Sequence, residues 1–259
     1  MDYNYHTHTI LCSHATGTME EYVLRAIEGG IKHMGFSDHA PFAYPDGHEA
    51  FYRVPLKEAA SYIAEAHALR DKYADKIDIK VGFEMEYYPP YFDRMLREAR
   101  ELGAEYLILG HHHIGNGYPL IRSSYIGTNQ NCGLELYTRT LIEGMHRGAF
   151  SYVAHPDIIN FKGDESFHLE KMREICRASR ELDLPLEINF LGIREHRPYP
   201  DDRFWKIAGE ERCPVTFGMD AHDTASAYDQ ASFATALEMV KKFGLNYIGK
   251  PRIINIQNL

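Results

Sequence analysis

The sequence predicts an α/β fold in which strands and helices alternate around a barrel of parallel strands. Short β-forming runs alternate with longer segments of helical periodicity, and the loops between them are too short to be interdomain linkers. A chain of 259 residues with 44% hydrophobic content can bury a sizeable core and matches the usual size of one such barrel. We therefore expect one domain over residues 1–259 with about seven β/α units.

The amino-terminal half is expected to begin with a strand at Tyr3–Tyr5. Thr18 and Glu21 then offer a capping box for a helix that ends at Gly29 and Gly30. The following strands are expected at 34–37, 77–83 and 106–109, and the helices between them at 56–72 and 93–102.

The carboxyl-terminal half continues the same alternation. Arg194 and Arg197 are expected in a loop after the strand at 186–189. The other expected strands are 152–154 and 215–217, and the expected helices are 134–147, 169–182, 201–209 and 233–243.

Histidine and carboxylate residues recur where the expected strands end. His6 and His8 form an H-x-H pair, and alternate residues of a strand share a face, so one metal ion can bind both rings. The carboxyl ends of the strands are where catalytic groups gather in a β/α barrel. The pattern therefore predicts a metal centre there, with further candidate ligands at His14, His39, Glu84, His155, Asp220 and His222.

Three consecutive histidines follow the strand at 106–109. Strand alternation allows either His112, or His111 together with His113, to face the mouth of the barrel. The spacing alone does not choose between them.

Composition excludes several kinds of partner. The net charge is −9 and no Lys/Arg-rich run occurs, so we expect a small-molecule ligand and no nucleic acid. No stretch approaches the roughly 20 apolar residues of a membrane span, and the amino terminus lacks the charge order of a signal peptide, so we expect a cytoplasmic protein. The four cysteines are widely spaced, as in a chain with reduced thiols. No pattern indicates an oligomeric state.

Most of the candidate ligands lie in four longer motifs, HTHTILCSHATGT at 6–18, GFSDHAPF at 35–42, VGFEMEY at 81–87 and GMDAH at 218–222. These motifs resemble those of the PHP (polymerase and histidinol phosphatase) superfamily, and among its members the histidinol-phosphate phosphatases. The resemblance covers nearly the full length of the chain. It implies a distorted (β/α)7 barrel with up to three divalent metal ions (zinc, iron or manganese) at the carboxyl ends of the strands.

The resemblance also implies a set of ligands for each ion. The first ion would be bound by His6, His8, Glu84 and Asp220, the second by Glu84, His112 and His155, and the third by His14, His39 and His222. The resemblance favours His112 among the three consecutive histidines, because the family pattern there is Gly-x-His.

The expected activity is metal-dependent hydrolysis of L-histidinol phosphate to L-histidinol and phosphate. Divalent ions lower the pKa of bound water, so the expected nucleophile is a hydroxide that bridges two ions. The candidates for protonating the leaving alcohol are Asp220, His222, Asp38 and a water on the third ion, with Asp220 and His222 as the expected catalytic residues. Phosphate oxygens favour bidentate arginine, for which the candidates in order of preference are Arg194, Arg197, Arg122 and Arg53.

Three alternatives compete with this interpretation. A PHP-type hydrolase of another phosphoester would use the same metal centre. A noncatalytic metal-binding module would bind metal but hydrolyse nothing. Metal-dependent amidohydrolases share the early H-x-H pair, but they commonly have a carboxylated lysine where this chain has Glu84.

Overall fold

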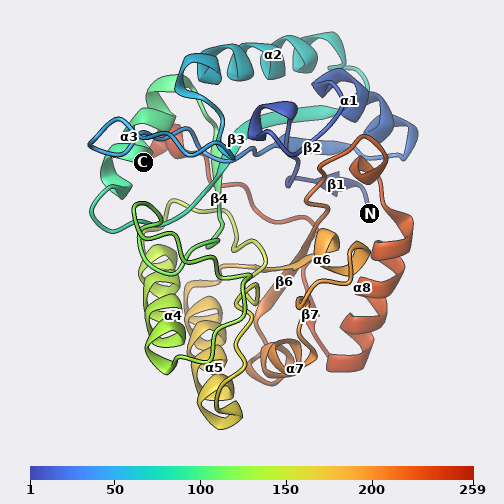
Figure 1. The fold of residues 1–259 in the computed structure, drawn as a ribbon. Coiled ribbons are helices and arrows are strands. Elements are labelled where there is room, and N and C mark those ends of the chain that lie inside the picture. The colour runs from blue at the N-terminus through green and yellow to red at the C-terminus, as the bar shows by residue number, and fades with distance from the viewer.

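Parallel strands form the centre of the molecule and helices surround them (Figure 1). The computed structural model describes residues 1–259. The strands are β1 Tyr3–Asn4, β2 His33–Phe36, β3 Asp78–Met85, β4 Tyr106–Leu109, β5 Leu186–Asn189, β6 Pro214–Gly218 and β7 Asn246–Tyr247. The α-helices are α1 Met19–Glu28, α2 Ala59–Lys72, α3 Phe92–Leu102, α4 Asn131–Met145, α5 Glu165–Leu182, α6 Phe190–Arg194, α7 Asp202–Glu211 and α8 Gln230–Phe243. Short 3-10 helices are η1 Ile10–Cys12, η2 Leu56–Glu58, η3 Ala225–Ala227 and η4 Ile256–Asn258.

The strands form two parallel sheets that meet at single bridges. One sheet has the order β1-β2-β3-β4 and the other has the order β5-β6-β7. Val153 bridges to Leu109 on one side and to Leu186 on the other, while Thr7 bridges to Ala221. All these bridges are parallel, so the sheets curl toward each other and their carboxyl ends face one common region.

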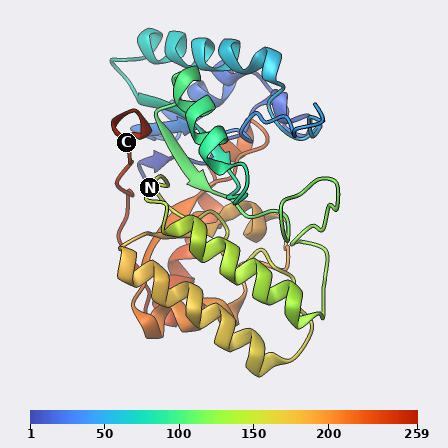
Figure 2. The same ribbon diagram turned by 90° about the vertical axis from the view of Figure 1, so that its left-hand side faces the viewer.

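Helices cover the outside of the curled sheets. Figure 2 shows α4 and α5 side by side, and these two helices are in direct contact. The main hydrophobic core of 63 buried residues lies between helices and strands. This packing holds the strands rigidly, so side chains at their ends have fixed positions. No helix has the length and apolar character needed to cross a membrane.

The expected helices are present, although α4, α5 and α8 begin three or four residues earlier than expected. Thr18 accepts a hydrogen bond from the backbone of Glu21, whose carboxylate accepts one from the Thr18 backbone, so the predicted capping box is present. The helix expected at 56–72 begins with the 3-10 turn η2 and continues as α2.

Three elements differ from the expectation. The strand expected at 152–154 forms only the two bridges of Val153, although Tyr152 and Ala154 also hydrogen-bond to Leu109. His155, with a left-handed φ of 29°, and Pro156, which has no N–H, follow directly. A short helix, α6, replaces the loop expected after β5, since the Asn189 side chain accepts a hydrogen bond from the Gly192 backbone N–H. The edge strand β7 was not expected.

Candidate metal centre

The carboxyl ends of the strands surround a cavity of about 290 Å³. The ring nitrogens and carboxylates that the sequence predicted as ligands come together here from both sheets. The cavity is lined by His8, His14, His39, Glu84, His112, His155, Ile158, Leu191, Glu195, Arg197, Tyr199, Asp220 and His222.

Glu84 lies at the centre of this group, and its two oxygens face different histidines. Oε2 lies 3.2 Å from Nδ1 of His39 and 3.5 Å from Nε2 of His8. Oε1 lies 2.9 Å from Nε2 of His155 and 3.2 Å from Nε2 of His112. The strand β3 runs past Glu84, because its pairing with β4 continues to Met85. This geometry is suited to a carboxylate that bridges two cations.

Asp220 faces the histidines of the H-x-H pair. Its Oδ1 lies 3.3 Å from Nε2 of His8 and 3.5 Å from Nε2 of His6. The Nε2 atoms of His6 and His8 are 3.3 Å apart, and Nε2 of His6 lies 3.7 Å from Oε2 of Glu84. The two rings therefore converge on one small volume, as expected for H-x-H ligands.

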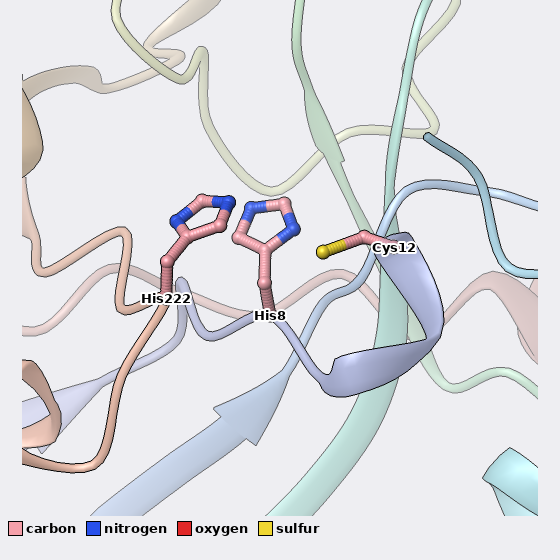
Figure 3. Close-up of side chains that lie close together, drawn as sticks. All are labelled: His8, Cys12 and His222. Carbon is pink, nitrogen blue, oxygen red and sulfur yellow. The ribbon is translucent and has the colours of Figure 1, made fainter. Parts of the chain in front are cut away.

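A third group lies beside the H-x-H pair. Ligand atoms of His14, His39 and His222 lie within 4.8 Å of one another. The rings of His8 and His222 are stacked with their centroids 4.1 Å apart. Figure 3 shows the two rings next to each other. The sulfur of Cys12 faces His8 in the same view, and these three residues also form a group that could bind a metal ion.

Several polar atoms at the centre have no hydrogen-bond partner although they are buried. They are both carboxylate oxygens of Glu84, Oδ1 of Asp220 and Nδ1 of His39. Buried polar atoms are normally paired, because an unpaired one loses its hydration without compensation. Imidazole and carboxylate are also the ligand types that zinc and similar divalent ions take. The residues present therefore fit a bound divalent cation.

Three further carboxylates hold the outer nitrogens of the ligand rings. Glu187 lies 2.9 Å from Nδ1 of His6, and Asp38 lies 3.3 Å from Nδ1 of His8. Glu86 lies 3.1 Å from Nδ1 of His112. A carboxylate that accepts the outer N–H leaves the inner nitrogen free to bind metal.

Glu86 and Glu187 were not expected as site residues from the sequence. Glu86 stands two positions after Glu84, and this i, i+2 spacing was a signal that could have found it. Glu187 lies in the middle of β5, between buried apolar residues, where a buried carboxylate needs a partner.

Glycines make room for two of these carboxylates. A Cβ on Gly218 would lie 2.4 Å from the carboxyl group of Glu187, and one on Gly110 would lie 2.4 Å from Oε1 of Glu84. Asp220, two residues after Gly218, has a left-handed φ of 47°. Such backbone conformations are costly for non-glycine residues and cluster at functional sites.

The structure distinguishes the three consecutive histidines. Nε2 of His112 faces Glu84, whereas His111 packs against the ring of Tyr137 and His113 contacts the Tyr88 hydroxyl. Burial lowers the pKa of His111 to about 3 and that of His113 to about 4. Only His112 therefore joins the predicted ligands.

The four candidate arginines have different surroundings. Arg197 lines the cavity, where it contacts the Glu195 carboxylate and the Tyr199 hydroxyl. Arg122 is exposed and donates a hydrogen bond to Gln130 outside the cavity lining.

Arg194 and Arg53 are each paired with a carboxylate outside the cavity lining. This position differs from the expectation, in which Arg194 was the preferred phosphate-binding arginine. Arg194 forms an ion pair with Asp229 at 2.9 Å. Arg53 is buried and forms an ion pair with Glu86 at 2.6 Å. Neither guanidinium group lines the cavity, which leaves Arg197, itself paired with Glu195, as the arginine best placed for a ligand there.

The charged groups at the centre change one another's pKa. Burial by itself would raise the pKa of Glu84, but the rings of His112 and His6 outweigh it and hold the pKa well below its usual range. Burial by itself would lower the pKa of His6, but Glu187, Asp220 and Glu84 hold it well above its usual range. Without metal, protons on the rings therefore balance the carboxylates.

In the metal-free protein the pKa values of both expected proton donors are shifted toward the neutral imidazole for His222 and the carboxylate for Asp220. Burial and the neighbouring His8 lower the pKa of His222 to about 3. The rings of His6, His8 and His222 overcome the effect of burial and hold the pKa of Asp220 well below its usual range. These directions favour ligand roles for both residues, and their part in protonating the leaving group stays a prediction.

A curled parallel sheet with imidazoles and carboxylates at its carboxyl ends is the arrangement typical of metal-binding α/β barrel-like proteins. A family model described as "PHP domain" matches residues 4–190. The chain therefore belongs to the PHP domain family, as its motifs suggested.

The chain is also similar to individual proteins that are named histidinol-phosphatases. The chain is 27% identical over 249 residues to a probable histidinol-phosphatase of Deinococcus radiodurans, covering 92% of each sequence. It is 25% identical over 273 residues to a histidinol-phosphatase of Lactococcus lactis, covering 95% of this chain and 92% of that one. The fold resembles the crystal structure of histidinol phosphate phosphatase from Lactococcus lactis, which contains zinc, L-histidinol and phosphate, with a TM-score of 0.72, 20% identity and coverage of 99% and 97% of the two chains.

Proposed function

We propose that this protein is a metal-dependent phosphomonoesterase that hydrolyses L-histidinol phosphate to L-histidinol and phosphate. The observation that carries this proposal is the group of buried, unpaired Glu84 and Asp220 oxygens among converging ring nitrogens. Relatives named histidinol-phosphatases, matched over nearly their full length, support the choice of substrate.

The ligand assignment is the one implied by the family resemblance, and the distances around Glu84 support it. Two of the three metal positions would share Glu84, with zinc, iron or manganese as the candidate ions. The ligands would be His6, His8, Glu84 and Asp220 for one ion, Glu84, His112 and His155 for a second, and His14, His39 and His222 for a third.

When bound, divalent ions acidify coordinated water and neutralise the charge of a transferring phosphoryl group. The protein's own residues orient the ligands, since Asp38 and Glu187 each accept the outer N–H of a ring. Arg197 is the cation placed to hold the non-bridging oxygens of the phosphate. Ile158 and Leu191 add apolar walls that keep part of the cavity dry.

The proposed architecture is a distorted (β/α)7 barrel formed by residues 1–259 as one domain. The parallel bridges of Val153 and of Thr7 with Ala221 support it, since they connect the two curled sheets. In this view residues 152–154 take the place of one strand, and β7 is an addition at the edge of β6.

The main alternative is a PHP-type hydrolase of another phosphoester. The metal centre and Arg197 would serve any phosphomonoester, so they do not by themselves select the alcohol. The relatives' names favour histidinol phosphate over a sugar phosphate or nucleotide.

A substrate panel tests the proposal. Phosphate release would be measured from L-histidinol phosphate, several other phosphomonoesters and one phosphodiester, with metal-free protein and with protein reloaded with zinc, manganese or iron. We expect metal-dependent turnover with a clear preference for histidinol phosphate. Preference for another ester would keep the metal chemistry and reject the substrate, and metal binding without turnover would favour the noncatalytic alternative.

A further inference from the structure

A buried ion pair lies directly behind one of the proposed metal ligands. Nη2 of Arg53 donates to Oε2 of Glu86 at 2.6 Å, and both side chains are at most 1% exposed. Nη1 of Arg53 donates to the carbonyl oxygen of Ala40 at 2.9 Å. The guanidinium is therefore fixed at two points and is not free to enter the cavity.

Glu86 connects this ion pair to His112. Its Oε1 lies 3.1 Å from Nδ1 of His112, while Nε2 of the same ring lies 3.2 Å from Oε1 of Glu84. One oxygen of Glu86 thus faces the guanidinium of Arg53 and the other faces the imidazole. An imidazole that donates through Nδ1 offers its lone pair at Nε2, which is the atom that points to the centre.

We propose that Arg53 and Glu86 are positioning residues that fix the tautomer and orientation of His112 for metal binding. The inference rests on the proposed function, because it concerns a ligand of the same metal centre. It also replaces the phosphate-binding role that the sequence suggested for Arg53.

Arg53 distinguishes Glu86 from the two other carboxylates behind ligand rings. Asp38 is held by neutral backbone N–H groups of Thr9 and His39, and Glu187 by the side-chain amide of Asn189. Of the three, only Glu86 is also paired with an arginine, in addition to the ring that it faces.

A buried carboxylate without compensation is strongly unfavourable, and arginine supplies both the charge and a rigid, two-pronged geometry. Arg53 therefore keeps Glu86 in place when His112 is engaged with metal. Because Ala40 directly follows His39, the same guanidinium also ties this carboxylate to the chain that carries a second proposed ligand.

The test compares zinc binding by wild-type protein and variants. Glu86→Met removes the acceptor behind His112, Arg53→Met removes its counter-charge, and Arg53→Lys keeps the charge but not the fork. The matched controls are Arg173→Met and its double variant with Glu211→Met, which disrupt another Arg–Glu pair far from the rings. Zinc per chain would be measured by equilibrium dialysis over a range of buffered free zinc, and the ligand field by the visible spectrum of the cobalt-loaded protein.

We expect one zinc equivalent to bind about 10- to 100-fold more weakly in Glu86→Met and Arg53→Met, the usual effect of losing an outer partner of a ligand. Arg53→Lys should recover part of this loss, and both controls should match wild type. The cobalt spectrum should change only in the Arg53 and Glu86 variants. At saturating metal, KM for the phosphoester should stay within about twofold of wild type, since neither residue touches substrate.

The double variant Arg53→Met/Glu86→Met removes both charges together. It serves as the control for misfolding of the single variants. Replacing a buried ion pair by apolar residues is often tolerated, whereas removing one partner is not. Wild-type zinc affinity in a folded double variant would overturn the inference, and so would full zinc binding with a raised KM in Arg53→Met. If wild-type protein itself binds no zinc or hydrolyses no phosphoester, the proposed function fails instead.

Discussion

Oε1 of Glu84 lies 2.9 Å from Nε2 of His155, yet no hydrogen bond satisfies this oxygen. The other oxygen of Glu84 is also buried and unpaired. Two sets of ring nitrogens thus face one carboxylate from two sides. A divalent cation on each side would satisfy both oxygens, which makes Glu84 the residue on which the proposed centre depends most.

Substitution of Glu84 by glutamine should remove metal and activity together. An amide offers one acceptor oxygen and turns an NH₂ group toward the rings, so it cannot bridge two cations. We expect the loss of at least one metal equivalent per chain and a decrease in hydrolysis of at least about a thousandfold, or about 4 kcal/mol in barrier. Metal analysis and initial rates check this, with the exposed His146→Ala as the control. Full metal content in Glu84→Gln would contradict the bridging role.

Metal binding should release protons. In the metal-free protein the carboxylates around His6 and His8 raise the pKa of both rings above their usual value, despite burial. A ring must lose its proton to bind metal, so affinity should weaken as pH falls. Calorimetry of zinc binding in buffers of different ionisation enthalpy measures the protons released. A heat that is independent of the buffer near pH 7 would show that the rings are already neutral.

Gly218→Ala should weaken metal binding although Gly218 carries no ligand atom. The added Cβ would lie 2.4 Å from the Glu187 carboxyl group, which holds Nδ1 of His6. We expect about tenfold weaker zinc binding, as for other losses of an outer partner. Gly133→Ala in α4 is the matched control, because its nearest neighbour would be 3.7 Å away. Equal zinc affinity in the two variants would show that Glu187 can move at no cost.

Arg197→Ala should raise KM for a phosphomonoester without changing the metal content. Arg197 lines the cavity, and a charge-assisted hydrogen bond contributes about 1.5–3 kcal/mol, which corresponds to a KM increase of roughly 10- to 100-fold. Arg122→Ala is the control, since Arg122 is exposed outside the cavity lining. Steady-state kinetics at saturating metal separates the two variants. An unchanged KM in Arg197→Ala would exclude phosphate binding by this side chain.

The sequence predicted the alternation of elements well where the local signals were strong. The capping box of Thr18 and Glu21, the strand at 106–109 and the strand at 186–189 are present as expected. The segment 152–154 has strand composition but forms only the two bridges of Val153, with hydrogen bonds between Leu109 and both Tyr152 and Ala154, and it is followed at once by His155, with a left-handed φ, and by Pro156. Composition does not show how long a strand can pair, since pairing depends on both neighbours.

The sequence determined which residue types stand at the strand ends, and therefore the kind of site. An H-x-H pair after a strand directs both rings to one face whatever the rest of the chain does. The recurrence of histidine and carboxylate at later strand ends predicted a metal centre for the same local reason.

Tertiary structure alone decided which partners these residues have. His6 meets Glu187 across 181 residues of chain, and Arg53 meets Glu86 instead of a ligand in the cavity. These contacts arise from the curling of the sheets and from the need of each buried charge for a partner. Neither factor is a property of a short segment, so the outer carboxylates and the role of Arg53 appear only when the chain is folded.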